Sequence, residues 1–204
     1  MRHLTNNHMK KLLFSLIAMG FIFNAHAQTS NGDKKKTSLA IRFNALDFGS
    51  AENVQNGSIG STLNAKKWGQ YASTTKSFGL NYTRQYTDQV DIFTNLDLGI
   101  ARLPLYAPNA MTRSNEDLLT SIESGVNIKM FKGDFRVNPY ITAGLGVRSF
   151  AFRTYSAYAP VGLGLQIKTC KGSNLNITTT YSTKMSKSFV PSYNYGVSYS
   201  FLLN

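Results

Sequence analysis

The sequence predicts an all-β protein, an eight-stranded antiparallel up-and-down β-barrel that crosses a membrane. Three features indicate this fold: an export signal near the N-terminus, eight later stretches in which apolar and polar residues alternate, and much glycine on the polar side of that alternation. Side chains of a strand point to opposite faces in turn, so each stretch has one apolar face. In a transmembrane barrel that face meets lipid.

Residues 9–28 have the layout of a secretory signal. A basic start at 9–11 is followed by an apolar core from Leu12 to Phe23 and a small-residue cleavage motif at 25–27. The apolar core is shorter than the ~20 residues that a membrane-spanning helix requires. We therefore expect residues 1–27 to be a signal peptide that is removed, rather than a membrane anchor.

The mature chain is expected to contain a polar linker over residues 28–38 and a barrel over residues 39–204. The expected strands are 39–45, 75–86, 90–103, 118–131, 138–150, 157–168, 174–184 and 193–201. Short turns alternate with longer connections, chiefly Gly49 to Thr74 and Pro104 to Asp117, which we expect to be polar loops on the cell exterior.

The direction in which the apolar faces point is inferred from the opposite, polar faces. These faces carry many glycines: Gly79, Gly99, Gly125, Gly144, Gly146, Gly162, Gly164 and Gly196. Small residues suit the crowded interior of an eight-stranded barrel, whereas a solvated outer face would favour longer charged residues. We therefore expect polar faces inward and apolar faces outward, with aromatic residues such as Phe48, Tyr140, Phe150 and Tyr193 in girdles at the two membrane interfaces.

Composition excludes several classes of function. All three histidines lie within residues 1–27, so the mature chain has no base that titrates near neutral pH and no histidine zinc ligand. We expect no enzymatic activity and no cofactor. Three of the 22 basic residues also lie there, which leaves 19 against ten acidic residues, a net charge of +9. Because the chain is exported and these charges are scattered, anionic lipid and lipopolysaccharide are the expected partners, and nucleic acid is not.

Four charged residues have inward parity in the expected strands: Arg42, Asp97, Glu123 and Arg148. An isolated buried charge costs several kcal/mol, so such groups should be paired. We expect the two acids to pair with the two arginines and to fill the lumen. The alternative is a gate or a narrow ion path through the same pairs.

The longest connection contains a basic and aromatic patch, Lys66, Lys67, Trp68 and Tyr71. These residues are a candidate contact site for a glycan or a protein partner. The alternative is an exposed loop with no recognition role.

The mature chain resembles small outer-membrane β-barrel proteins of Gram-negative bacteria, the group that includes the OmpA N-terminal barrel, OmpX and PorT-like proteins. The resemblance rests on NPYITAGLGV (138–147), APVGLGLQIK (159–168) and the ending YNYGVSYSFLLN (193–204). It implies an outer-membrane location and insertion by the barrel-assembly machinery. The family's terminal assembly signal corresponds to Tyr195, Val197, Tyr199 and Phe201. Three residues follow Phe201 here, whereas many relatives end on the aromatic residue.

Function is less constrained than architecture. The leading hypothesis is a structural or surface-interaction protein whose lumen is filled by side chains and whose surface ligand is unknown. The alternatives are a porin-like small-solute pore or gated channel and, from the PorT-like resemblance alone, an accessory of protein secretion.

Overall fold

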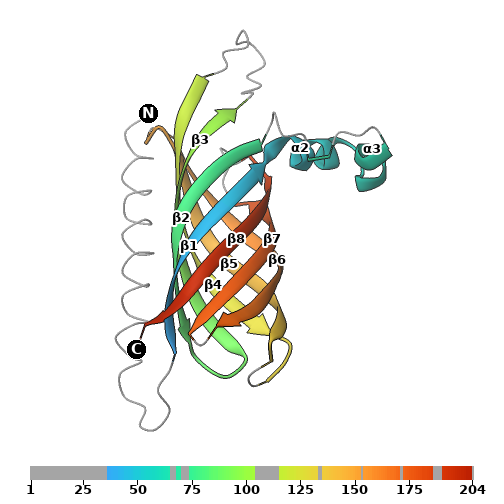
Figure 1. Ribbon diagram of the computed structural model, residues 1–204. Helices are drawn as coiled ribbons and strands as arrows, with labels where there is room; N and C mark the ends of the chain where they lie inside the picture. The colour runs from blue at the N-terminus through green and yellow to red at the C-terminus, as the bar shows by residue number, and fades with distance from the viewer. Residues whose placement is uncertain are drawn as a thin grey trace. The chain divides into compact units, whose positions relative to one another are not determined.

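The computed structural model describes residues 36–64, 68–69, 74–103, 115–132, 135–152, 154–170, 172–185 and 190–203. These residues form a closed antiparallel barrel in which each strand pairs with the next and the last pairs with the first (Figure 1). The elements are β1 (Thr37–Asp47), α2 (Phe48–Asn56), α3 (Ile59–Asn64), β2 (Thr74–Gln85), β3 (Val90–Leu103), β4 (Asn115–Lys129), β5 (Val137–Phe150), β6 (Thr154–Cys170), β7 (Ser173–Lys184) and β8 (Ser192–Leu203).

The expected fold class and all eight strands are confirmed. Several strands are longer than expected: β1 begins at Thr37, β4 at Asn115 and β6 at Thr154. The added residues lie at strand ends, where backbone pairing continues after the apolar alternation has stopped. The expected signal peptide and residues 28–35 of the expected linker lie outside the described residues.

Closure of the barrel depends on the pairing of β1 with β8. Their register sets Leu39 opposite Phe201 and Ile41 opposite Tyr199. Paired positions share one face of a sheet, so these apolar side chains lie side by side on the outer wall. A register shift of one residue would turn the whole apolar face of β8 inward.

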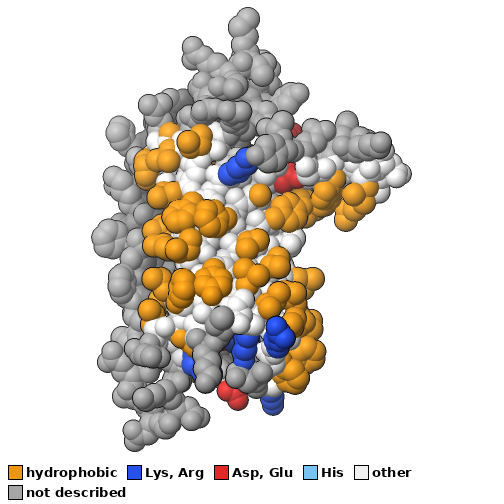
Figure 2. All heavy atoms as spheres, in the orientation of Figure 1, with side chains coloured by type: hydrophobic (Ala, Val, Ile, Leu, Met, Phe, Trp, Pro, Cys, Tyr) orange, Lys and Arg blue, Asp and Glu red, His pale blue; other side chains and the backbone are white. Residues whose placement is uncertain are grey.

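The polarity of the barrel is the reverse of that in a soluble protein. Large apolar side chains on the strands are exposed, among them Leu80, Leu96, Ile122, Leu145 and Leu163, and they cover much of the wall in Figure 2. Buried side chains inside the barrel include Arg42, Asn44, Asn95, Asp97, Glu123 and Arg148. An exterior of this kind is stable in hydrocarbon, and a closed barrel leaves no unpaired strand edge there. The chain is therefore a transmembrane barrel.

The expectation of a polar loop from Gly49 to Thr74 was wrong for residues 49–56 and 59–64, which lie in α2 and α3. Asp47 caps α2: its carboxylate accepts hydrogen bonds from the backbone N–H and the hydroxyl of Ser50. Both helices are short, and each contains glycine, which weakens the sequence signal for a helix. No helix among the described residues is long and apolar enough to cross a membrane.

Two glycines on the inner wall make room for tyrosines. Gly146 pairs with Tyr158 and Gly164 pairs with Tyr140 across the β5–β6 ladder. A Cβ atom at Gly146 would lie 2.5 Å from the Tyr158 ring, and one at Gly164 would overlap the Tyr140 ring. Both rings therefore occupy space in the lumen that a side chain at the paired position would need.

Candidate functional site

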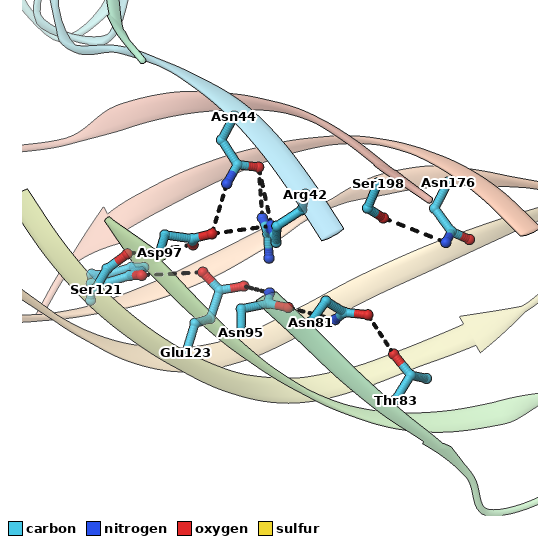
Figure 3. A network of polar contacts seen from close by, with 11 residues as sticks. Arg42, Asn44, Asn81, Thr83, Asn95, Asp97, Ser121, Glu123, Asn176 and Ser198 are labelled. Atoms are coloured by element: carbon cyan, nitrogen blue, oxygen red, sulfur yellow. Dashed lines mark hydrogen bonds and ion pairs between the residues drawn. The ribbon is translucent and has the colours of Figure 1, made fainter. Parts of the chain in front are cut away.

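The centre of the lumen holds a buried charged network (Figure 3). Arg42 Nε lies 3.3 Å from Asp97 Oδ1, and both side chains are less than a tenth exposed. Asn44 joins the two: its amide oxygen accepts from Arg42 Nη2 at 2.9 Å, and its amide nitrogen donates to Asp97 Oδ1 at 2.8 Å. The structure thus brings together Arg42 and Asp97 of the four charged residues singled out in the sequence.

Glu123 and Arg148 are connected through an aromatic residue that the sequence did not single out. Tyr158 donates a hydrogen bond to Glu123 Oε2 at 3.2 Å, and its ring centroid lies 4.7 Å from the Arg148 guanidinium carbon. Glu123 also accepts from the Asn95 amide at 3.2 Å, and Arg148 donates to the Ser192 hydroxyl at 3.1 Å. The only feature of the sequence that could have identified Tyr158 as part of the network was its position on the inner wall. Its pairing with Gly146 explains why the ring fits there.

An apolar cluster lies at the loop end of the lumen. Leu46, Phe48, Ala101, Leu119 and Phe150 are buried against one another, and Val190 packs on them. The Phe48 and Phe150 ring centroids lie 6.4 Å apart, and Arg148 lies 5.5 Å from the Phe48 centroid. This cluster places an apolar group on the loop side of the charged network.

The cluster corrects part of the expected aromatic girdles. Phe48 is 4% exposed and Phe150 is 8% exposed, so neither faces lipid. Tyr140 is also buried, and its hydroxyl lies 2.9 Å from that of Thr178. Tyr140 and Phe150 share the inward parity of Arg148, whereas Phe48 begins a helix, so strand parity does not apply to it.

The turn end of the lumen is polar and open. A cavity of about 60 Å³ lies against Arg42, Asn95 and Glu123. Beyond it, Lys129 Nζ lies 2.8 Å from Asp91 Oδ2. The same pair borders a wider vestibule of about 490 Å³. The described residues thus place an apolar cluster at the loop end of the lumen and cavities large enough for water at the turn end.

Of the expected loop patch, only Trp68 lies within the described residues, whereas Lys66, Lys67 and Tyr71 lie outside them. The Trp68 ring centroid lies 4.8 Å from that of Tyr193, which in turn lies 5.0 Å from that of Tyr181. Tyr181 and Tyr193 are partners across the β7–β8 ladder. Trp68 therefore extends an aromatic group at the loop end of the barrel.

The expected assembly-signal residues lie on β8. Val197, Tyr199 and Phe201 are between 36% and 50% exposed, and Tyr195 is half-buried. The rings of Tyr199 and Phe201 are 4.9 Å apart. Their role in assembly stays a prediction.

The described residues contain no group of three or more His, Cys, Asp or Glu side chains placed to hold a metal ion. The titratable side chains at the centre of the lumen hydrogen-bond to one another and to amides and hydroxyls. This arrangement neutralises the buried charges within a narrow barrel.

Comparisons with known proteins agree with this architecture. No family model and no curated protein matched the sequence. Among solved structures, Neisserial surface protein A is similar with a TM-score of 0.54 and 12% identity, over 82% of this chain and 96% of that one. The N-terminal barrel of OprF from Pseudomonas aeruginosa aligns with a TM-score of 0.49 and 15% identity, over 83% and 100% of the two chains. OprG from the same organism aligns with a TM-score of 0.49 and 9% identity, over 85% of this chain and 98% of that one.

The comparison with Neisserial surface protein A supports the fold alone, a closed barrel of the small outer-membrane type. The lipid-facing belt and polar interior of this chain supply the physical reason for its location. It is a β-barrel protein of the bacterial outer membrane.

Proposed function

We propose that this protein is a non-conducting outer-membrane barrel with a structural or surface-interaction role. The observation that carries the proposal is the apolar cluster of Leu46, Phe48, Ala101, Leu119 and Phe150 at the loop end. Ions cross a dry apolar constriction poorly because they lose hydration there without gaining new partners. The charged network behind the cluster has its acids already engaged by donors, so it offers a permeating ion few free ligands.

Planar-bilayer recording of the purified full chain tests this proposal. We expect no steady conductance. The variant F48A/F150A removes two rings from the cluster and should give measurable openings. The matched control F43A/F78A removes an aromatic pair of similar spacing, 5.3 Å between centroids, from the lipid-facing wall and should stay silent. Steady conductance of the unmodified chain would overturn the proposal.

A small-solute pore is the second candidate, and the water-accessible cavities favour it. The vestibule and the inner cavity reach from the turn end to Arg42 and Glu123. A pore would require the apolar cluster to move aside. Conductance that appears in the unmodified chain and falls when Asp97 is replaced would support this candidate over the first.

The surface-interaction role would belong to the loop end. Trp68 and the neighbouring Lys66, Lys67 and Tyr71 are the proposed recognition residues, and lipopolysaccharide phosphate is the proposed partner of the basic pair. Binding of purified lipopolysaccharide to the barrel in nanodiscs should weaken at least threefold in K66A/K67A. The control K132A changes a lysine at the turn end and should leave binding unchanged. Equal binding by all three proteins would exclude this partner.

A further inference from the structure

The helical segment between β1 and β2 starts inside the barrel and leaves it across the rim. Phe48, the first residue of α2, lies in the apolar cluster of the lumen, and Ala51 one turn later is fully buried. At the other end of α2, the Gln55 amide donates to the hydroxyl of Tyr181 on β7 at 3.4 Å. Figure 1 shows α2 and α3 projecting sideways from the upper end of β1. We call residues 48–64 the arm.

The outer part of the arm carries an apolar face that is exposed and has no partner among the described residues. Ile59 and Leu63 are one helical turn apart in α3, and they are 56% and 53% exposed. Figure 2 shows hydrophobic side chains along the underside of the arm and on the barrel wall below it. The chain has no charged residue from 53 to 65, so an apolar environment imposes no cost of burying charge here.

The arm is held at a defined height on the barrel. Gln55, before α3, contacts Tyr181, and Trp68, after α3, stacks on Tyr193. These two tyrosines are cross-strand partners near the loop ends of β7 and β8. Tyrosine and tryptophan at such positions mark the membrane–water interface.

We propose that the arm lies along the outer-leaflet interface, with Ile59 and Leu63 in the lipid at the boundary between headgroups and acyl chains. The apolar face of the arm lies above the lipid-facing wall of the barrel in Figure 2, and the two attachment points beside α3 involve interfacial aromatics. An amphipathic segment so placed buries its apolar side in the bilayer and leaves its polar side in water. The partner of this surface is therefore lipid.

Depth-dependent quenching tests the proposal in the full chain. Cys170, the sole cysteine, is first replaced by serine. An environment-sensitive label is then placed by L63C or by the control N64C, whose side chain is also exposed but lies on another face of α3. In vesicles of phosphatidylcholine brominated near the headgroup, we expect at least twofold greater quenching at position 63. Equal quenching at both positions would overturn the proposal.

Two further measurements complete the test. Trp68 is the only tryptophan, so the unlabelled chain reports on the attachment point that follows the arm. We expect bromolipid to quench Trp68 and aqueous iodide to quench it weakly, and the reverse would overturn the proposal. Bromolipid quenching at position 63 should not change with the density of protein in the vesicles. A fall in this quenching at high protein density would mean that a second copy of the chain, and not lipid, covers the surface. Heat-modifiable gel mobility verifies that each labelled barrel is folded.

Discussion

Removal of the Asp97 carboxylate should destabilise the barrel strongly, because Arg42 would remain buried without its ionic partner. Asp97 is 5% exposed and Arg42 is 8% exposed. Breaking a buried pair by removing one partner costs about 3–5 kcal/mol. Two features favour the lower end of this range. Arg42 keeps Asn44 as an acceptor at 2.9 Å, and it borders a cavity of about 60 Å³ that has room for water. We therefore expect D97L to lower the free energy of unfolding by about 3 kcal/mol.

The double variant R42M/D97L separates the charge effect from a packing defect. Removing both members of the pair leaves neither Arg42 nor Asp97 buried without the other, so the double variant should be more stable than D97L and within about 1 kcal/mol of the unmodified chain. Urea unfolding in lipid vesicles, followed by heat-modifiable gel mobility, measures each value. D88L applies the same substitution to an exposed carboxylate in the β2–β3 turn and should change stability by less than about 0.5 kcal/mol. A double variant as unstable as D97L would refute the reasoning.

Three other substitutions test separate parts of the structure. G164A adds a methyl group under the Tyr140 ring and should cost about 1–3 kcal/mol in urea unfolding, and a neutral result would mean that the ring does not lie there. Leu96 is exposed at the middle of β3, so L96R should lower the free energy of unfolding by about 2–4 kcal/mol. L203R, at a strand end, should lower it by about 0–1 kcal/mol. Equal effects would contradict the membrane orientation. D47A removes the cap of α2, which stabilises the helix by about 1 kcal/mol, so it should speed proteolysis of the arm about fivefold. An unchanged rate of proteolysis would show that the cap is dispensable.

Strand positions and their parity could be predicted because both follow from a period of two. The outward assignment of Leu96, Ile122 and Leu145 agrees with their exposure, and the inward assignment of Asp97 and Glu123 agrees with their burial. Neither result needed knowledge of which strand pairs with which. A single strand read by itself gives the parity, and the glycine-rich polar faces taken together give the direction.

The partners within the lumen could not be predicted in the same way. Parity places Glu123 and Arg148 inside but does not give their depth, which depends on the register of every intervening strand pair. The structure places Tyr158 between them because Gly146, opposite it on β5, leaves the ring space to lie across the wall. The glycine-rich inner face was correctly taken as a sign of crowding, and the side chains that use the space are aromatic as well as charged.

The arm was missed for a related reason: its helices are stabilised by tertiary contacts. A helix of nine residues is unstable alone in water, and the sequence of α2 has little helical periodicity. Asp47 fixes its first turn, and burial of the Phe48 ring contributes about 2–3 kcal/mol at the same point. Phe48 thus belongs to the apolar cluster in the lumen and also holds the base of the arm. The contact that we propose makes the barrel a poor channel is also the contact that directs the chain outward over the rim, towards the surface where we propose that it meets lipid.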